Sequence, residues 1–396
     1  MLRLRNIGRL FTGGDAGVVG GASVIVDRGR IAWSGKQGTE PRELTRALTD
    51  EYDCGGGLVT PGLIDAHTHP VYAGNRMAEV AMRTAGASYA EIAKAGGGIV
   101  ATVKATRRAD TRSLQAATAA RLKRWFAGGA TTVEAKTGYF LNRSGELRSV
   151  EVLRRLAARR DLPNLEITFL GAHALPPGGG RSLDDYARQV AAWCKGARRA
   201  GARFCDVFCD QGYFTVEQSR LILQAGVDAG LVPRLHADEL ARTGGSELAA
   251  ELRAASADHL LCANEEDARA LARSGVAATL APVTALSMGK LPPVRELQDA
   301  GAVIALGTDH NPGTSGLTSM SVVIALAIAV FKMSVDQALI AATVGGARSL
   351  ALTDRGRVVE GLRADLVLWD ADHEGAFAWA FGLAPKRVWK GGVAVR

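Results

Sequence analysis

The central part of the sequence alternates short apolar runs with amphipathic stretches, and this pattern limits the possible folds more than any other feature. The first apolar run extends from Leu58 to Ile64. Seven more follow at residues 130–135, 165–171, 203–208, 231–236, 256–260, 276–281 and 302–308. The stretches between them begin with polar residues and mostly end near glycine, as helices do. This alternation predicts an α/β fold, a (β/α)8 TIM-like barrel rather than an open sheet.

The two ends of the chain differ from this middle part. Short β-prone runs separated by a turn occupy residues 22–26 and 31–33, and similar runs return at residues 364–369 and 386–395. We therefore expect a small β-sandwich domain formed by both chain termini, from residues 1–55 and 355–396. The barrel would then occupy residues 56–354, between the two halves of that domain.

The composition is that of an ordinary globular protein. A length of 396 residues with 47% hydrophobic residues allows a large buried core. The N-terminus lacks a long apolar stretch, so neither a signal peptide nor a membrane span is predicted. The five cysteines are scattered and odd in number, which favours free thiols in a reducing compartment. We expect a cytoplasmic protein without a membrane partner.

The formal net charge of +8 does not predict a nucleic-acid partner. Arginine pairs such as Arg154-Arg155 and Arg159-Arg160 are dispersed along predicted helices, as on solvated helix faces. Basic stretches interleaved with aromatic residues, which nucleic-acid binding would favour, do not occur in the sequence. A positive field of this kind favours a small anionic substrate instead.

Histidines gather where the predicted strands end. His67 and His69 follow the first apolar run, His173 follows the third strand, and His236 and His259 end the fifth and sixth. In a barrel of parallel strands these ends meet at one face, where active sites form. We therefore expect the chemistry of this chain to lie at that face.

Four residues from three strand ends form a candidate metal site: His67, His69, His236 and Asp309. In extended backbone the side chains of Asp65, His67 and His69 point to the same side. A hydrolytic metal site needs neutral imidazoles and a carboxylate, with one position left for water. Zinc and iron both accept such ligands, so the sequence predicts a divalent or trivalent Zn or Fe ion without choosing between them. His310 should point away from Asp309.

Six segments near the strand ends carry a family resemblance. They are residues 96–99, 134–139, 169–176, 236–240, 257–260 and 308–314. In this order they resemble the imidazolonepropionase family of the amidohydrolase superfamily, densely from Cys54 to Ala351 and mainly in architecture outside that range. The resemblance implies hydrolysis of the ring amide of 4-imidazolone-5-propanoate to N-formimidoyl-L-glutamate, a step of histidine degradation, by a metal-activated water.

The resemblance also implies three catalytic residues. Glu239, three residues after His236, would take a proton from the water and pass it to the leaving nitrogen. His259 would hydrogen-bond the developing oxyanion or steady the water. Asp309 would share the base role with its ligand role, and the sequence does not rank Glu239 above Asp309 as the first base.

Substrate contacts follow from the same matched motifs. Arg76, nine residues after His67, matches an arginine whose guanidinium suits a carboxylate through two parallel hydrogen bonds. The other matched contact positions are Tyr139, His173, Glu239, Asn311, Gly313 and Thr314. Together these residues predict a site for a small anionic substrate.

One metal ion and a homodimer complete the expectations from the resemblance. Binuclear relatives carry a bridging lysine on the fourth strand, and the run that ends at Cys209-Asp210 has none. Lys136, on the second strand, is therefore not expected to bridge two ions. His373, beyond the barrel, is expected at the surface.

Two other functions remain open at this point. A cyclic amidine deaminase of the cytosine or guanine type would share the ligands and the His-x-x-Glu arrangement. Arg76 and the segment from Lys136 to Tyr139 favour an anionic substrate over a nucleobase. A non-catalytic basic barrel that binds nucleic acid would show salt-sensitive affinity and no bound metal.

Overall fold

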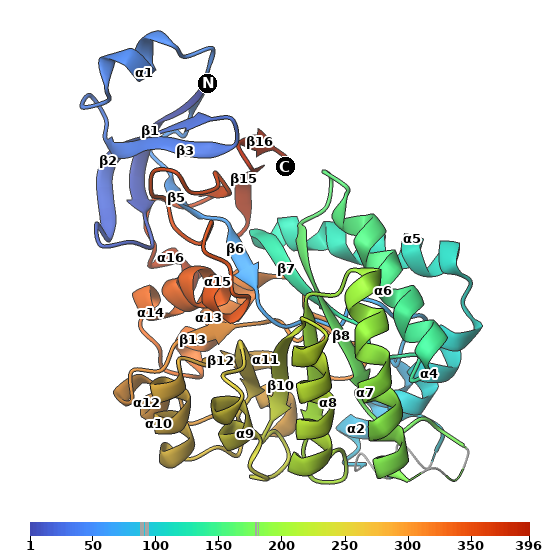
Figure 1. Ribbon diagram of the computed structural model, residues 1–396. Helices are drawn as coiled ribbons and strands as arrows, with labels where there is room; N and C mark the ends of the chain where they lie inside the picture. The colour runs from blue at the N-terminus through green and yellow to red at the C-terminus, as the bar shows by residue number, and fades with distance from the viewer. Residues whose placement is uncertain (88–90, 92–94, 179, 181) are drawn as a thin grey trace.

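Two β-sheets organise the chain, as seen in a computed structural model that describes residues 1–396 except 88–90, 92–94, 179 and 181. One sheet lies inside a ring of helices, and the other brings the blue N-terminal strands beside the red C-terminal strands (Figure 1). The inner sheet contains eight parallel strands in chain order. They are β6 (Leu63–Asp65), β7 (Ala130–Lys136), β8 (Asn164–Ala172), β9 (Phe204–Cys209), β10 (Val232–Ala237), β11 (Ser256–His259), β12 (Ala277–Leu280) and β13 (Ile304–Leu306).

The first and last strands of this sheet meet and close it. The backbone N–H of Ala66 donates to the carbonyl of Leu306 at 3.2 Å, and the N–H of Asp309 donates to the carbonyl of His67 at 3.0 Å. The predicted (β/α)8 barrel is therefore confirmed, and the seven predicted strands after the first agree with the observed bounds within two residues.

Helices cover the outside of the barrel, and polar caps set where several of them begin. Thr215 and Asn264 each form a capping box, with Gln218 and Asp267 respectively. The longer helices are α4 (Gly98–Arg108), α5 (Thr111–Leu122), α6 (Arg143–Ala157), α7 (Leu183–Ala200), α8 (Val216–Asp228), α10 (Glu265–Ser274) and α13 (Met320–Ala329). Among the described residues, no helix has both the length and the apolar character needed to cross a bilayer.

Shorter helices occupy the connections and the C-terminal part of the barrel. They are α1 (Arg42–Arg46), α2 (Ala78–Thr84), η1 (Lys123–Gly128), α9 (Gly245–Glu251), α11 (Pro282–Met288), α12 (Val294–Asp299), α14 (Val335–Ile340), η2 (Ala341–Gly345), α15 (Gly346–Ser349) and α16 (Ala376–Trp379). The inward faces of the outer helices and the outward faces of the barrel strands share one large hydrophobic core.

The terminal sheet has its own core, to which both ends of the chain contribute. Its hydrogen-bonded order is β16-β15-β14-β5-β1-β2-β3, and β4 also pairs with β1. Leu4 and Val24 from the N-terminal strands pack in one cluster with Leu366 and Trp389 from the C-terminal strands. The strands are β1 (Leu2–Phe11), β2 (Val18–Asp27), β3 (Arg30–Lys36), β4 (Asp50–Asp53), β5 (Leu58–Pro61), β14 (Leu366–Trp369), β15 (Pro385–Lys390) and β16 (Val393–Ala394).

The apolar run that precedes the histidines splits between the two sheets. Its first half, β5, pairs with β1 and β14 in the terminal sheet, whereas its second half, β6, pairs with β7 in the barrel. Gly62 alone separates β5 from β6, and a Cβ atom there would lie 2.2 Å from Oγ1 of Thr131. The junction therefore requires glycine. The division of the chain at residues 55 and 355 remains a prediction, and β5 lies in the terminal sheet although it follows residue 55.

Candidate active site

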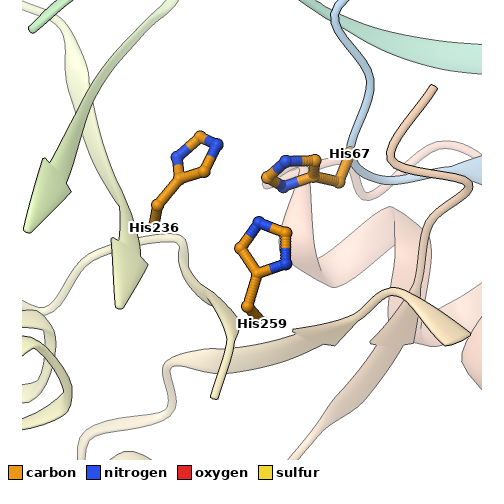
Figure 2. Close-up of side chains that lie close together, drawn as sticks. All are labelled: His67, His236 and His259. Carbon is orange, nitrogen blue, oxygen red and sulfur yellow. The ribbon is translucent and has the colours of Figure 1, made fainter. Parts of the chain in front are cut away.

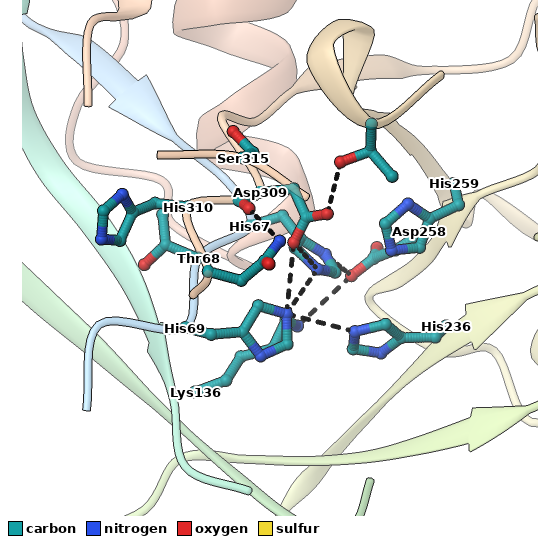
Figure 3. A network of polar contacts seen from close by, with 12 residues as sticks. His67, Thr68, His69, Lys136, His236, Asp258, His259, Asp309, His310 and Ser315 are labelled. Carbon is teal, nitrogen blue, oxygen red and sulfur yellow. Dashed lines mark hydrogen bonds and ion pairs between the residues drawn. The ribbon is translucent and has the colours of Figure 1, made fainter. Parts of the chain in front are cut away.

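Four predicted metal ligands converge at the carboxyl ends of the barrel strands (Figure 3). His67 and His69 follow β6, His236 lies in β10, and Asp309 follows β13. The Nε2 atom of His69 lies 3.1 Å from Nε2 of His67 and 3.4 Å from Nε2 of His236. Oδ1 of Asp309 lies 3.5 Å from Nε2 of His67 and 3.4 Å from Nε2 of His69. All four side chains are buried.

This spacing fits a metal ion. Nitrogen and oxygen ligands about 2.0–2.1 Å from a tetrahedral ion lie about 3.3 Å from one another. Burial lowers the pKa of His67 well below its usual value and also lowers that of His69. Burial opposes protonation of His236 as well, but the nearby Asp206 carboxylate outweighs it and raises the pKa. The three nitrogens and one carboxylate oxygen thus form a donor set of the kind that zinc or iron binds.

Carboxylates behind the histidines orient the rings. Nδ1 of His67 lies 2.7 Å from Oδ2 of Asp258, and Nδ1 of His236 lies 3.1 Å from Oδ1 of Asp206. Because an ionised carboxylate can only accept, each Nδ1 carries the hydrogen and each Nε2 presents a lone pair to the cluster. On the opposite side, Thr284 donates its hydroxyl hydrogen to Oδ2 of Asp309 at 2.5 Å.

Glu239 lies on a turn after β10, and the carboxylate of Asp210 stabilises this turn. Asp210 accepts the backbone N–H groups of Glu239, Leu240 and Ala241 at 2.7, 2.8 and 3.0 Å. The Glu239 carboxylate then faces His259, with 3.7 Å between its Oε2 and the ring Nε2. Burial raises the pKa of Glu239, which makes its carboxylate a better proton acceptor.

His259 lies beside Glu239 and also beside the cluster of predicted metal ligands. His67, His236 and His259 each offer one ring nitrogen within 4.8 Å of the others, and Figure 2 shows the three rings turned toward a common centre. Residue His259 has a φ of +75°, a strained backbone conformation for a non-glycine residue. Such strain is typical of functional sites, where the surrounding structure holds it in place.

The predicted substrate residues surround one cavity next to this cluster. Its volume is about 240 Å³, and Arg76, Tyr139, His173, Asn311 and Thr314 line it together with His69, His236, Glu239, His259 and Asp309. Gly313 adjoins the cavity at Arg76, because a Cβ atom at Gly313 would lie 2.4 Å from Arg76 Nη1. The structure therefore brings all the predicted site residues together.

Arg76 is held by an acidic residue that sequence reasoning missed. Its Nε and Nη2 donate to both carboxylate oxygens of Glu79 at 2.7–3.0 Å. Glu79 also accepts the backbone N–H of Gly98 at 2.8 Å, which ties the first barrel loop to the start of α4. The spacing of three residues from Arg76 is the signal that could have pointed to Glu79.

Two more groups of residues were missed. Phe208 and Tyr213 wall the cavity with ring centroids 4.0 Å apart, and neither stands out in the sequence. The carboxylates of Asp206 and Asp258 lie behind the ligands. Asp258 directly precedes His259 in the resembling segment 257–260, whereas Asp206 is an acidic residue inside an apolar strand and lies in none of these segments.

One expectation about side-chain direction is wrong, and another holds for a different reason. Asp65 does not share the side of the histidines, because its carboxylate accepts hydrogen bonds from Thr308 N–H at 2.9 Å and Trp125 Nε1 at 2.6 Å. His310 does lie away from the cluster (Figure 3). Its Nε2 lies 3.2 Å from the hydroxyl of Tyr72. However, the cause is not extended backbone, since Asp309 has a φ of +46°.

Comparisons with known proteins agree with this geometry. A sequence model of the Amidohydrolase family matches residues 72–395. An imidazolonepropionase of Anaeromyxobacter dehalogenans (strain 2CP-C) is 41% identical over 372 residues, which cover 92% of this chain and 88% of the relative. An imidazolonepropionase of Cereibacter sphaeroides (strain ATCC 17029 / ATH 2.4.9) is 41% identical over 390 residues and 97% of each chain.

Solved structures show the same fold at low sequence identity. An atrazine chlorohydrolase from Arthrobacter aurescens TC1, complexed with zinc, has a TM-score of 0.72 and 20% identity, with 100% of this chain and 95% of that chain covered. An adenosine deaminase from Xanthomonas campestris with bound zinc has a TM-score of 0.75 and 18% identity, with coverage of 99% and 92%. The family model and the curated relatives place the chain: it belongs to the amidohydrolase family and, within that family, to the imidazolonepropionases.

Proposed function

We propose that this chain hydrolyses the ring amide of 4-imidazolone-5-propanoate to N-formimidoyl-L-glutamate. One water molecule is added, and the bond between the ring carbonyl carbon and its nitrogen breaks. The observation that supports this most is that three of the four proposed ligands, His69, His236 and Asp309, line the same cavity as Arg76. The relatives that are 41% identical carry the name of this activity.

The metal site would hold one Zn or Fe ion through Nε2 of His67, His69 and His236 and Oδ1 of Asp309. When bound, such an ion polarises a carbonyl group and lowers the pKa of a water molecule. The protein contributes the orientation of the ligands, because Asp206 and Asp258 keep the two Nδ1 hydrogens away from the cluster.

Glu239 acts as the first base in this proposal. It takes a proton from the attacking water and delivers it to the leaving ring nitrogen. Asp309 is less suited to that role, because Oδ2 accepts from Thr284 and Oδ1 faces the histidine nitrogens. His259 lies beside Glu239 and hydrogen-bonds the oxygen on which negative charge develops.

Arg76 binds the propionate of the substrate. Glu79 holds the guanidinium through Nε and Nη2, and Nη1 lies on the side of Gly313, where a Cβ atom would be 2.4 Å from it. Tyr139 and His173, whose ring centroids are 5.1 Å apart, contact the planar ring of the substrate. Asn311 and Thr314 close the cavity from the loop after β13.

We further propose that the protein is a cytoplasmic homodimer. All five cysteines are free thiols, which suits a reducing compartment. The homodimer rests on the family resemblance, and light scattering of the purified protein would test it.

An assay on 4-imidazolone-5-propanoate tests the activity. The purified protein, loaded separately with zinc and with iron, should form N-formimidoyl-L-glutamate, identified by mass spectrometry. Ammonia release from cytosine or guanine without turnover of the imidazolone would instead establish the deaminase alternative.

A further inference from the structure

A cluster of five charged side chains lies inside the barrel below the metal ligands. This buried ion cluster consists of Glu134, Lys136, Asp206, Arg234 and Asp258, and each of these side chains is fully buried. Nζ of Lys136 lies 2.6 Å from Asp206, 2.9 Å from Glu134 and 3.4 Å from Asp258. The function derived so far gives Lys136 no role.

Strand geometry places the cluster one layer below the ligands. Side chains two residues apart on a strand point to the same side, so Arg234 and His236 both face the barrel interior. In the parallel ladders, Arg234 pairs with Asp206 on β9 and His236 pairs with Asp258 on β11. Lys136 reaches this layer from β7, and Figure 3 shows it beneath the histidines.

Lys136 joins the two carboxylates that orient metal ligands. Asp206 accepts from Nδ1 of His236, and Asp258 accepts from Nδ1 of His67. Without a cation between them, these carboxylates would repel each other in a site that excludes water. We propose that Lys136 is a positioning residue: it fixes Asp206 and Asp258, and through them it aims Nε2 of His236 and of His67 at the metal ion.

The sign of the effect separates positioning from simple charge. The cluster contains two cations and three carboxylates, a net charge of −1. Removal of the Lys136 charge alone makes the surroundings more negative, which by itself would strengthen the binding of a cation. Loss of ligand orientation has the opposite effect, since changes behind metal ligands typically weaken metal affinity about 10–100-fold.

The test measures metal affinity in the full chain with Lys136→Met, which replaces the alkyl part of the side chain with one of similar length and removes the ammonium group. Apo protein is titrated with Zn²⁺ against a chromophoric chelator, and the Co²⁺ form is recorded by visible absorption. We expect affinity to fall about 10–100-fold and the Co²⁺ spectrum to change. Unchanged or tighter binding with an unchanged spectrum would overturn the proposal.

Control variants separate positioning from general damage. Val133→Ala lies on the same strand with its side chain in the outer core, so it should lower stability and leave metal affinity unchanged. If Lys136→Met does not fold, Lys136→Gln replaces it with the same expectation. A double-mutant cycle combines Lys136→Met with Asp206→Asn. The two losses of metal affinity should not add, because both changes remove the same contact between Lys136 and Asp206. Additive losses would contradict action through Asp206.

The inference rests on the proposed metal site and not on the identity of the substrate. A wild-type chain that binds no Zn²⁺ or Co²⁺ would overturn both the proposed function and the role of Lys136. If the wild-type chain and the Lys136→Met variant bind metal with the same affinity and the same Co²⁺ spectrum, only the role of Lys136 is overturned. Product assays on 4-imidazolone-5-propanoate do not enter either comparison.

Discussion

Glu239 and His259 face each other across 3.7 Å, although they come from the ends of different barrel strands. The carboxylate is oriented by the turn that Asp210 holds, and the imidazole by a strained backbone at His259. In the proposed mechanism, a proton acceptor and a hydrogen-bond donor thus face the same reacting group before substrate arrives, which avoids reorganisation during the reaction.

Replacement of Glu239 by Gln should leave metal content intact and lower kcat by about 10²–10⁴-fold, because it removes proton transfer and not a ligand. Metal analysis and steady-state kinetics measure the two quantities. Glu217→Gln, on the exposed start of α8, is the matched control and should change neither. A fully active Glu239→Gln variant would exclude Glu239 from the mechanism.

Arg76→Lys should raise KM about 10–100-fold with a smaller effect on kcat, because a lysine keeps the charge but not the two-pronged hydrogen bonding. The kinetics are compared with those of an analogue that lacks the propionate. Wild-type protein should bind that analogue about as weakly as the Arg76→Lys variant binds the substrate itself. If the variant keeps its preference for the carboxylate, Arg76 does not recognise it.

Glu146→Gln should disturb the loop that carries Tyr139. The fully buried Glu146 carboxylate accepts the backbone N–H groups of Gly138, Phe140 and Leu141, each at 2.8 Å. An amide leaves at least one of these donors without an acceptor, at a cost of about 1–3 kcal/mol. We expect a lower Tm and a higher KM. The control is Glu151→Gln on the exposed face of α6, and equal behaviour of the two variants would refute the assignment.

Removal of the metal should abolish activity and lower the Tm, because four buried ligand atoms lose their common partner. A ligand at 1,000 times its Kd stabilises the folded state by about 4 kcal/mol. Calorimetry before and after chelation measures the loss, and elemental analysis gives the stoichiometry. We expect one ion per chain and recovery with zinc or iron; two ions per chain would contradict the single-ion site.

The barrel and the ligands could be predicted from the sequence because both depend on local patterns. Strand and helix periods repeat along the chain, and histidines at strand ends share one face in any closed parallel barrel. The charged side chains that hold the histidine ligands in place could not be predicted in the same way. Asp206 and Lys136 are 70 residues apart, and their contact at 2.6 Å depends on side-chain packing inside the barrel. The turn at Asp309 was also missed, since a positive φ at aspartate leaves no mark in the sequence.

The single residue between β5 and β6 has a consequence for how this enzyme can be divided. Gly62 links a strand of the terminal sheet directly to the strand that leads to His67, with no flexible linker in between. β5 also needs β14, which lies near the other end of the chain, as its partner. The barrel therefore cannot be separated from the terminal sheet by cutting a linker. Removal of the C-terminal strands would leave β5 without its partner β14, and His67 lies only six positions after Pro61, the last residue of β5.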